Sequence, residues 1–197
     1  MAAREELLAA LRRAGRKPTP RPAIDGVGAR FPDLPTRFAE AVTAVGGTTV
    51  RTPDLAAAAA ALAALPVRRD ARRVVSLVPE VGAATEESHA TADPHALEGV
   101  DLAVLPGALG VAENGAIWVE GSALIHRALM VVPEHLAVVL RAADLVADFH
   151  DAYARIDLPG RPRFGLFLAG PSKTADIEQS LVIGAHGARS LTVLLID

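Results

Sequence analysis

The sequence predicts an open α/β domain, in which a largely parallel, twisted sheet carries helices on both faces. One observation is that several short runs, including residues 74–78 and 191–196, are apolar except for one hydroxyl residue each, Ser76 and Thr192, and do not alternate with polar residues. Strands that are buried on both faces show this pattern. A second observation is that helical segments fall between many of these runs, as parallel connections require. In such sheets ligands bind beyond the carboxyl ends of the strands.

Residues 1–35 are predicted to form a helix and an extended arm ahead of one domain at residues 36–197. Residues 2–14 place leucines on one stripe and charges opposite, which indicates an amphipathic helix. Residues 15–35 are rich in proline and glycine, which favours an arm with little regular structure. Two interpretations stay open for this arm. It is a disordered tail, or it docks on the body or on a second subunit.

The body is predicted to alternate strands with helices. Gly46-Gly47 ends its first helix, and Pro53 suits the first turn of the second. Asn114-Gly115 is a strong hairpin signal within residues 110–119. The helices are expected at residues 36–45, 53–65 and 142–153. The strands are expected at residues 48–51, 74–78, 102–105, 129–132, 137–140, 164–169 and 191–196.

Composition excludes several classes of function. The net charge is -3, which gives no electrostatic basis for binding nucleic acid or an anionic membrane. The first residues are charged and lack the long apolar core of a signal peptide. No apolar run approaches the roughly 18 residues of a membrane span. We therefore expect a cytoplasmic protein.

The chain has no cysteine. Disulfides, thiolate catalysis and cysteine-ligated zinc or iron–sulfur clusters are therefore excluded within it. One-electron chemistry would need a metal centre on a partner protein. Acidic residues and histidines crowd residues 86–95, but their spacing matches no metal-binding motif, so no metal site is predicted. Nucleophile-elbow and dinucleotide-binding glycine patterns are missing as well.

Residues 165–187 put more polar groups at a predicted strand-to-helix joint than any other stretch. Gly170 permits close backbone approach or a positive φ, and Pro171 fixes the turn. Thr174 is a predicted N-cap, which places Asp176 in the first turn of the helix. Free amides at such a joint, together with Lys173, would bind an anion. The alternative is a capped turn that binds no ligand.

Three side chains are candidates for acid–base or covalent catalysis. Glu178 falls among apolar residues on the predicted helix, where a carboxylate must be paired, hydrogen-bonded or protonated. His186 lies at the predicted helix end, where it would transfer protons or cap carbonyls. Glu113 precedes the hairpin turn and would supply a second carboxylate if that turn reaches the same cleft. The alternatives are an ion pair with an arginine for Glu178 and a solvent-facing side chain for Glu113.

These residues resemble the LUD-domain family, and within it the lactate-utilisation protein C group. The C-terminal run resembles a family pattern of the form Gly-Pro-Ser-x-Thr-x-Asp-Ile-Glu, followed by Val-Gly-x-His-Gly-Pro. The matching residues there are Gly170, Pro171, Ser172, Thr174, Asp176, Ile177, Glu178, Gly184, His186 and Gly187. Upstream, Glu113 and Gly115 match a Glu-Thr-Gly-Thr turn, and Pro133 and His135 match a Leu-Pro-x-His segment. The resemblance covers roughly residues 36–197.

The chain departs from the family pattern at three positions. Asn114 and Ala116 replace hydroxyl residues of the Glu-Thr-Gly-Thr turn, so a hydroxyl contact to a ligand is in doubt there. Ala188 replaces the usual proline. The position of Lys173 varies in the family, which weakens its interpretation as an anion clamp.

The resemblance implies a fold like that of sugar-phosphate isomerases, CoA transferases and formyltetrahydrofolate cyclo-ligases. It also implies a role in oxidising L-lactate to pyruvate beside two iron–sulfur partner proteins, with no cofactor in this chain. Two alternatives remain: a stand-alone enzyme acting on a sugar phosphate, acyl-CoA or folate compound, and a scaffolding subunit. A small anionic substrate and a homo-oligomer are compatible with each. The catalytic candidates are Glu178, Glu113 and His186; the ligand-binding candidates are Gly115, Gly170, Pro171, Ser172, Lys173, Thr174, Asp176 and Gly187.

Overall fold

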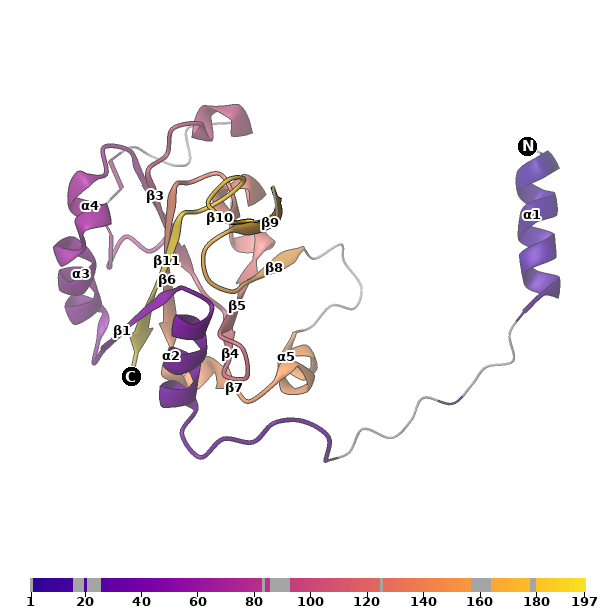
Figure 1. Ribbon diagram of the computed structural model, residues 1–197, viewed down its shortest axis with the longest axis horizontal. Helices are drawn as coiled ribbons and strands as arrows, with labels where there is room; N and C mark the ends of the chain where they lie inside the picture. The colour runs from indigo at the N-terminus through magenta and orange to yellow at the C-terminus, as the bar shows by residue number, and fades with distance from the viewer. Residues whose placement is uncertain are drawn as a thin grey trace.

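A parallel sheet of five strands forms the centre of the molecule (Figure 1). The computed structural model describes residues 2–15, 20, 26–82, 84–85, 93–124, 126–156, 164–177 and 180–197. The strand order is β1-β11-β6-β3-β2, and neighbouring strands pair in parallel. This result confirms the predicted open, largely parallel sheet. The strands are β1 (Thr48–Thr52), β2 (Val74–Ser76), β3 (Leu102–Pro106), β6 (His135–Arg141) and β11 (Ser190–Ile196).

Helices α3 (Leu55–Ala64) and α4 (Pro66–Asp70) cover one face of this sheet (Figure 1). Asp54 starts α3 by accepting a 2.7 Å hydrogen bond from the backbone N–H of Ala57, as an N-cap residue does. Leu62 of α3 packs with Leu194 of the interior strand β11 in the core on this side. The sequence predicted a helix at α3 but none at α4.

A helix and a second sheet cover the opposite face. Helix α2 (Leu34–Ala44) begins at the N-cap Asp33 and buries Phe38 and Val42. The second sheet has four strands in the order β7-β4-β5-β8. They are β4 (Leu109–Val111), β5 (Ala116–Glu120), β7 (Leu145–Val146) and β8 (Gly165–Leu168). Strands β4 and β5 form the predicted hairpin at Asn114-Gly115, which is confirmed.

Two element predictions between residues 129 and 153 were wrong. Residues 129–132 do not form a strand, because η3 (Arg127–Met130) is a 3₁₀ helix that buries Leu129 and Met130. Residues 142–153 divide into η4 (Ala142–Asp144), β7 and α5 (Phe149–Arg155). The division follows from Asp148, which accepts a 3.0 Å hydrogen bond from the N–H of Asp151 and so starts α5 late. The other 3₁₀ helices are η1 (Pro94–Leu97) and η2 (Gly121–Ala123).

The predicted N-terminal helix is present as α1 (Ala2–Arg13). Part of the arm that follows contacts the body. The guanidinium of Arg30 lies 3.3 Å from the carboxylate of buried Asp148, and the Arg37 guanidinium lies 5.2 Å from the centre of the Phe31 ring. A hydrogen bond from the Asp151 amide holds the pKa of Asp148 below its usual value. Residues 16–19 and 21–25 of the arm lie outside the described residues.

Within the part of the chain that the structure describes, no helix combines the length and the apolar character that a membrane crossing needs.

Candidate functional site

The helix predicted after Lys173 is instead a β-hairpin. Strand β9 (Lys173–Ile177) pairs antiparallel with β10 (Ser180–Ile183). The prediction was wrong because a short apolar run cannot distinguish the two periods, and because Thr174, Ile177 and Val182 are β-branched residues that favour strands. Thr174 is therefore not an N-cap, and Asp176 does not lie in the first turn of a helix.

Glu178, the first catalytic candidate, lies with Gln179 outside the described residues. Its neighbours Ile177 and Ser180 are partners in the β9–β10 ladder. Because strands lie on both sides of residues 178–179, the chain does not form the apolar helical stripe on which Glu178 was predicted to lie. Its participation in a site stays a prediction that depends only on the resemblance of the motif.

The turn that contains Gly170 docks against the carboxyl end of α2. Gly170 has a φ of 70°, and a Cβ atom there would collide with the carbonyl of Val45. Glycine is therefore required for both reasons that the sequence suggested. The ammonium group of Lys173 donates a hydrogen bond to the same Val45 carbonyl. Because the carboxyl end of a helix carries partial negative charge, this contact gives Lys173 a local structural role.

The hairpin turn before β5 docks on the same helix. Gly115 has a φ of 73°, and a Cβ atom there would lie 2.6 Å from the Val42 nitrogen. Val42 and Val45 are three residues apart, which is about 4.5 Å along a helix axis. The two glycine turns thus lie side by side on α2. The adjacent Glu113 is exposed, and its carbonyl accepts a 3.0 Å hydrogen bond from Arg37.

Ser172 joins the loop that precedes β11. Its N–H donates to the Ala188 carbonyl at 2.8 Å, and its carbonyl accepts from the Gly184 N–H at 2.9 Å. Gly187 approaches so closely that a Cβ atom would lie 3.1 Å from the Ser172 hydroxyl oxygen. The structure therefore brings Pro171, Ser172 and Gly187 into one compact unit, while the His186 side chain is exposed.

Beyond this loop, the first residues of β6 and β11 form a polar cluster. The Nδ1 atom of His135 lies 2.8 Å from the hydroxyl oxygen of Ser190, its partner across the ladder. The Arg189 guanidinium lies 2.6 Å from the Glu134 carboxylate, and the Arg189 N–H donates to the Glu134 carbonyl at 2.8 Å. Sequence reasoning noted His135 only through the resemblance and missed Arg189 and Ser190. Polar residues at the starts of two neighbouring strands were the signal that could have identified them.

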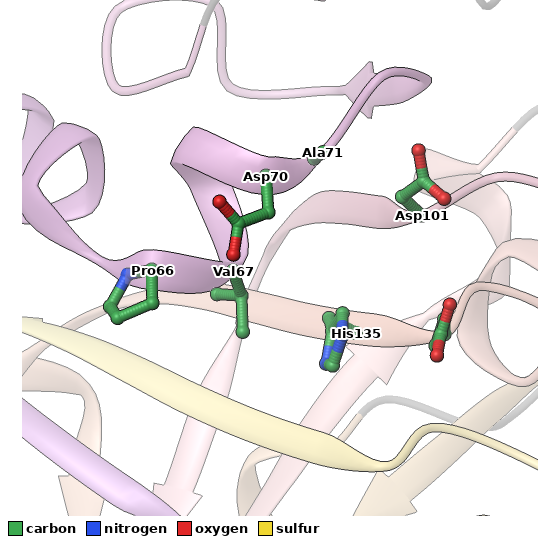
Figure 2. A pocket seen from close by; sticks show the side chains of 7 residues that line it. Pro66, Val67, Asp70, Ala71, Asp101 and His135 are labelled. Carbon is green, nitrogen blue, oxygen red and sulfur yellow. The ribbon is translucent and has the colours of Figure 1, made fainter.

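His135 also borders a pocket of about 200 Å³, here called the amino-edge pocket (Figure 2). Figure 2 shows Asp70 reaching it from the end of α4, Asp101 from the loop before β3, and His135 from the start of β6. Its lining residues are Pro66, Val67, Asp70, Ala71, Asp101, Glu134 and His135.

The amino-edge pocket is acidic, and most of its polar groups are already engaged. One carboxylate oxygen of Asp101 accepts hydrogen bonds from the N–H groups of Arg72 and Arg73 at 2.7 and 2.8 Å. These bonds, that of Arg73 first, hold the pKa of Asp101 below its usual value. The residues that line the pocket include no lysine or arginine. The nearby Arg189 is already paired with Glu134, so an anion would find no available cation here. The pocket suits a cation or a hydrogen-bond donor better than a carboxylate.

The described residues place no three histidine, aspartate or glutamate side chains where they could share a metal ion. Residues 86–92, which include His89, are outside that statement because they lie outside the described residues. The polar contact that the structure places beside the amino-edge pocket is the hydrogen bond between His135 and Ser190.

Comparison with known proteins adds a family and a fold. Residues 97–196 match the LUD domain, and they make up just over half of the 197 residues. The matched range contains both glycine turns, His135 and β11. A crystal structure of a DUF162 family protein from Deinococcus radiodurans is similar in fold, with a TM-score of 0.56 and 22% identity. That similarity covers 83% of this chain and 96% of the other.

Three curated relatives are similar over part of the chain. An uncharacterised protein of Neisseria meningitidis serogroup B is 35% identical over 89 residues, which are 44% of this chain and 38% of the relative. Lactate utilization protein C of Shouchella clausii is 30% identical over 49% of this chain and 44% of its own length. Lactate utilization protein C of Oceanobacillus iheyensis is 26% identical over 51% of this chain and 45% of its own length. The chain thus spans less than half the length of each.

Proposed function

Because the chain belongs to the LUD domain family, we propose that it is a non-redox component of an L-lactate utilisation system that works with iron–sulfur proteins. One observation carries the proposal: proteins named lactate utilization protein C are similar to about half of this chain. The fold is compatible with this role, since an open parallel sheet supports ligand sites at its strand ends. The role of the chain would be to bind the small hydroxy acid and to present it to its partners.

The chemistry favours a division of labour between proteins. Oxidation of L-lactate to pyruvate releases two electrons and two protons, and the electrons need an acceptor. The chain contains no cysteine to ligate an iron–sulfur cluster, so cysteine-ligated clusters would belong to partners. His135 is a candidate to carry a proton, since its ring nitrogen Nδ1 is already oriented by the Ser190 hydroxyl at 2.8 Å.

Deleting the gene and restoring it on a plasmid tests the proposal. We expect the deletion strain to lose lactate-dependent dye reduction in cell extracts and to retain pyruvate metabolism. The restored, tagged chain should recover the activity and co-purify with proteins that show iron–sulfur absorbance. Unchanged lactate-dependent reduction in the deletion extract would contradict the role. Turnover of a sugar phosphate, acyl-CoA or folate compound by the purified chain alone would favour the stand-alone enzyme instead.

A further inference from the structure

A second pocket lies at the opposite end of the central sheet, and we propose that it binds a small 2-hydroxycarboxylate such as L-lactate. This inference rests on the proposed function and adds where in the fold the hydroxy acid would bind. The pocket, here called the carboxyl-edge pocket, has a volume of about 250 Å³. Its lining residues are Leu55, Val78, Glu80, Pro106, Gly107, Val139, Arg141, Asp144 and Ile196.

The walls of this pocket come from the ends of four parallel strands. Val78 follows β2, Pro106 ends β3, Arg141 ends β6 and Ile196 ends β11. This is the edge where open α/β sheets bind ligands, because the loops there diverge and leave a crevice. Neither glycine turn on α2 contributes to it.

Arg141 supplies the cation that the amino-edge pocket lacks. Its guanidinium forms no hydrogen bond or ion pair with the residues that the structure describes. Arg51 at the same edge is different, since its Nη2 lies 2.7 Å from the Asp197 carboxylate and its Nε donates to the same oxygen at 3.2 Å. An arginine without a protein partner is available for a carboxylate, which its planar fork of N–H groups matches well.

The strand registers place Arg141 in a row with a buried hydroxyl. Arg141 pairs with Ile196, and Ile196 pairs with Thr52, so the three side chains share one face across β6, β11 and β1. Thr52 is 5% exposed, and its hydroxyl oxygen has no hydrogen-bond partner within the described structure. Thr52 does not line the pocket, so its buried hydroxyl marks the floor of the sheet beside Ile196 and is not a contact for the ligand.

The groups in and beside this pocket match the three parts of lactate. The Arg141 guanidinium pairs with the carboxylate, while Val139 and Ile196 offer an apolar surface to the methyl group. Glu80 and Asp144 accept a hydrogen bond from the hydroxyl. Pyruvate carries a keto oxygen in place of this hydroxyl. The keto oxygen has no proton to donate, and the carboxylates of Glu80 and Asp144 repel it. The pocket should therefore prefer lactate to pyruvate.

Titration calorimetry of the full-length chain with L-lactate and with pyruvate tests the assignment. We expect L-lactate to bind, and Arg141→Gln to weaken it at least tenfold with the unfolding midpoint unchanged. The matched control is Arg51→Gln, which removes the same charge at the same edge but on the other face of the sheet, and it should change the affinity less than twofold. Asp144→Asn should reduce the preference for lactate over pyruvate. Thr52→Val, which lies outside the pocket lining, should leave the lactate affinity unchanged.

Lactate binding that is unaffected by Arg141→Gln would overturn this location and leave the lactate role intact. No binding of L-lactate to the folded chain would also overturn it. Conversely, Arg141-dependent binding of lactate in a chain whose deletion does not alter lactate metabolism would retain the site and contradict the proposed function. The binding and deletion experiments therefore fail independently.

Discussion

The amino-edge and carboxyl-edge pockets lie at opposite ends of β6 and on the same face of the sheet. His135 begins this strand and Arg141 ends it, which separates them by about 20 Å. At the amino edge the polar groups satisfy one another: Glu134 pairs with Arg189, and His135 pairs with Ser190. At the carboxyl edge, Arg141 has no such partner within the described structure. Polar groups that pair internally stabilise the fold, whereas unpaired ones remain free for a ligand.

Asp101→Ala should have the largest effect on stability and would test whether the amino edge is structural. Its carboxylate accepts two backbone hydrogen bonds, and hydrogen bonds to a charged group contribute about 1.5–3 kcal/mol. We expect urea unfolding at neutral pH to show a loss of about this size. The control is Asp70→Ala, an exposed carboxylate of the same pocket, which should change the free energy by less than about 0.5 kcal/mol.

The effect of Asp101 should also depend on pH. Because its pKa is lowered in the folded state, its stabilisation is complete above the unfolded pKa of about 3.9 and is lost as the pH falls through the folded pKa. The stability difference between the natural chain and Asp101→Ala should therefore shrink in acid. If the difference in unfolding free energy between the two proteins stayed constant as the pH fell below about 3.9, the ionised carboxylate would not be the stabilising group.

A double-mutant cycle between His135 and Ser190 should give an intermediate effect. Their 2.8 Å contact predicts a coupling energy of about 0.5–1.5 kcal/mol from unfolding of the two single alanine variants and the double variant. Ser180, an exposed serine on β10, serves as a control whose alanine variant should be additive with that of His135. Additivity between His135 and Ser190 themselves would mean that this contact does not stabilise the amino edge.

The smallest effects should distinguish the arginines of the two edges. Arg189→Gln breaks a surface ion pair and should cost about 0.2–1 kcal/mol, an effect that high salt removes. Arg141→Gln breaks no pair in the described structure and should stay within about 0.5 kcal/mol at any salt concentration. Unfolding measured at low and high salt checks both. A salt-dependent loss of stability for Arg141→Gln would show that Arg141 forms an ion pair within the protein and is not free for a ligand.

Much of the central sheet could be predicted from the sequence, because burial on both faces leaves a continuous apolar run. Residues 191–196 are apolar apart from Thr192, and β11 is buried from Leu191 onward. The Asn114-Gly115 turn could also be predicted from the sequence, since few residues tolerate the positive φ that Gly115 adopts.

The site was much harder to predict. The segment 173–183 is too short, and its pattern too mixed, to distinguish a helix from a hairpin. Glu178 was therefore assigned to a face with the 3.6-residue period of a helix, although strands lie on both sides of it. The docking of Gly115 and Gly170 on α2 is a contact between distant segments, which no local pattern encodes. The row of Thr52, Ile196 and Arg141 likewise depends on strand register.

The position of β11 has a consequence for synthesis of the protein. This strand, made last of the five, inserts between β1 and β6 and gives each of them a partner. Until it leaves the ribosome, both strands present open edges to other nascent chains, which favours aggregation. The sheet can close only after translation has passed residue 196. The complete sheet should therefore form late, and delayed release of this strand should prolong the need for a chaperone.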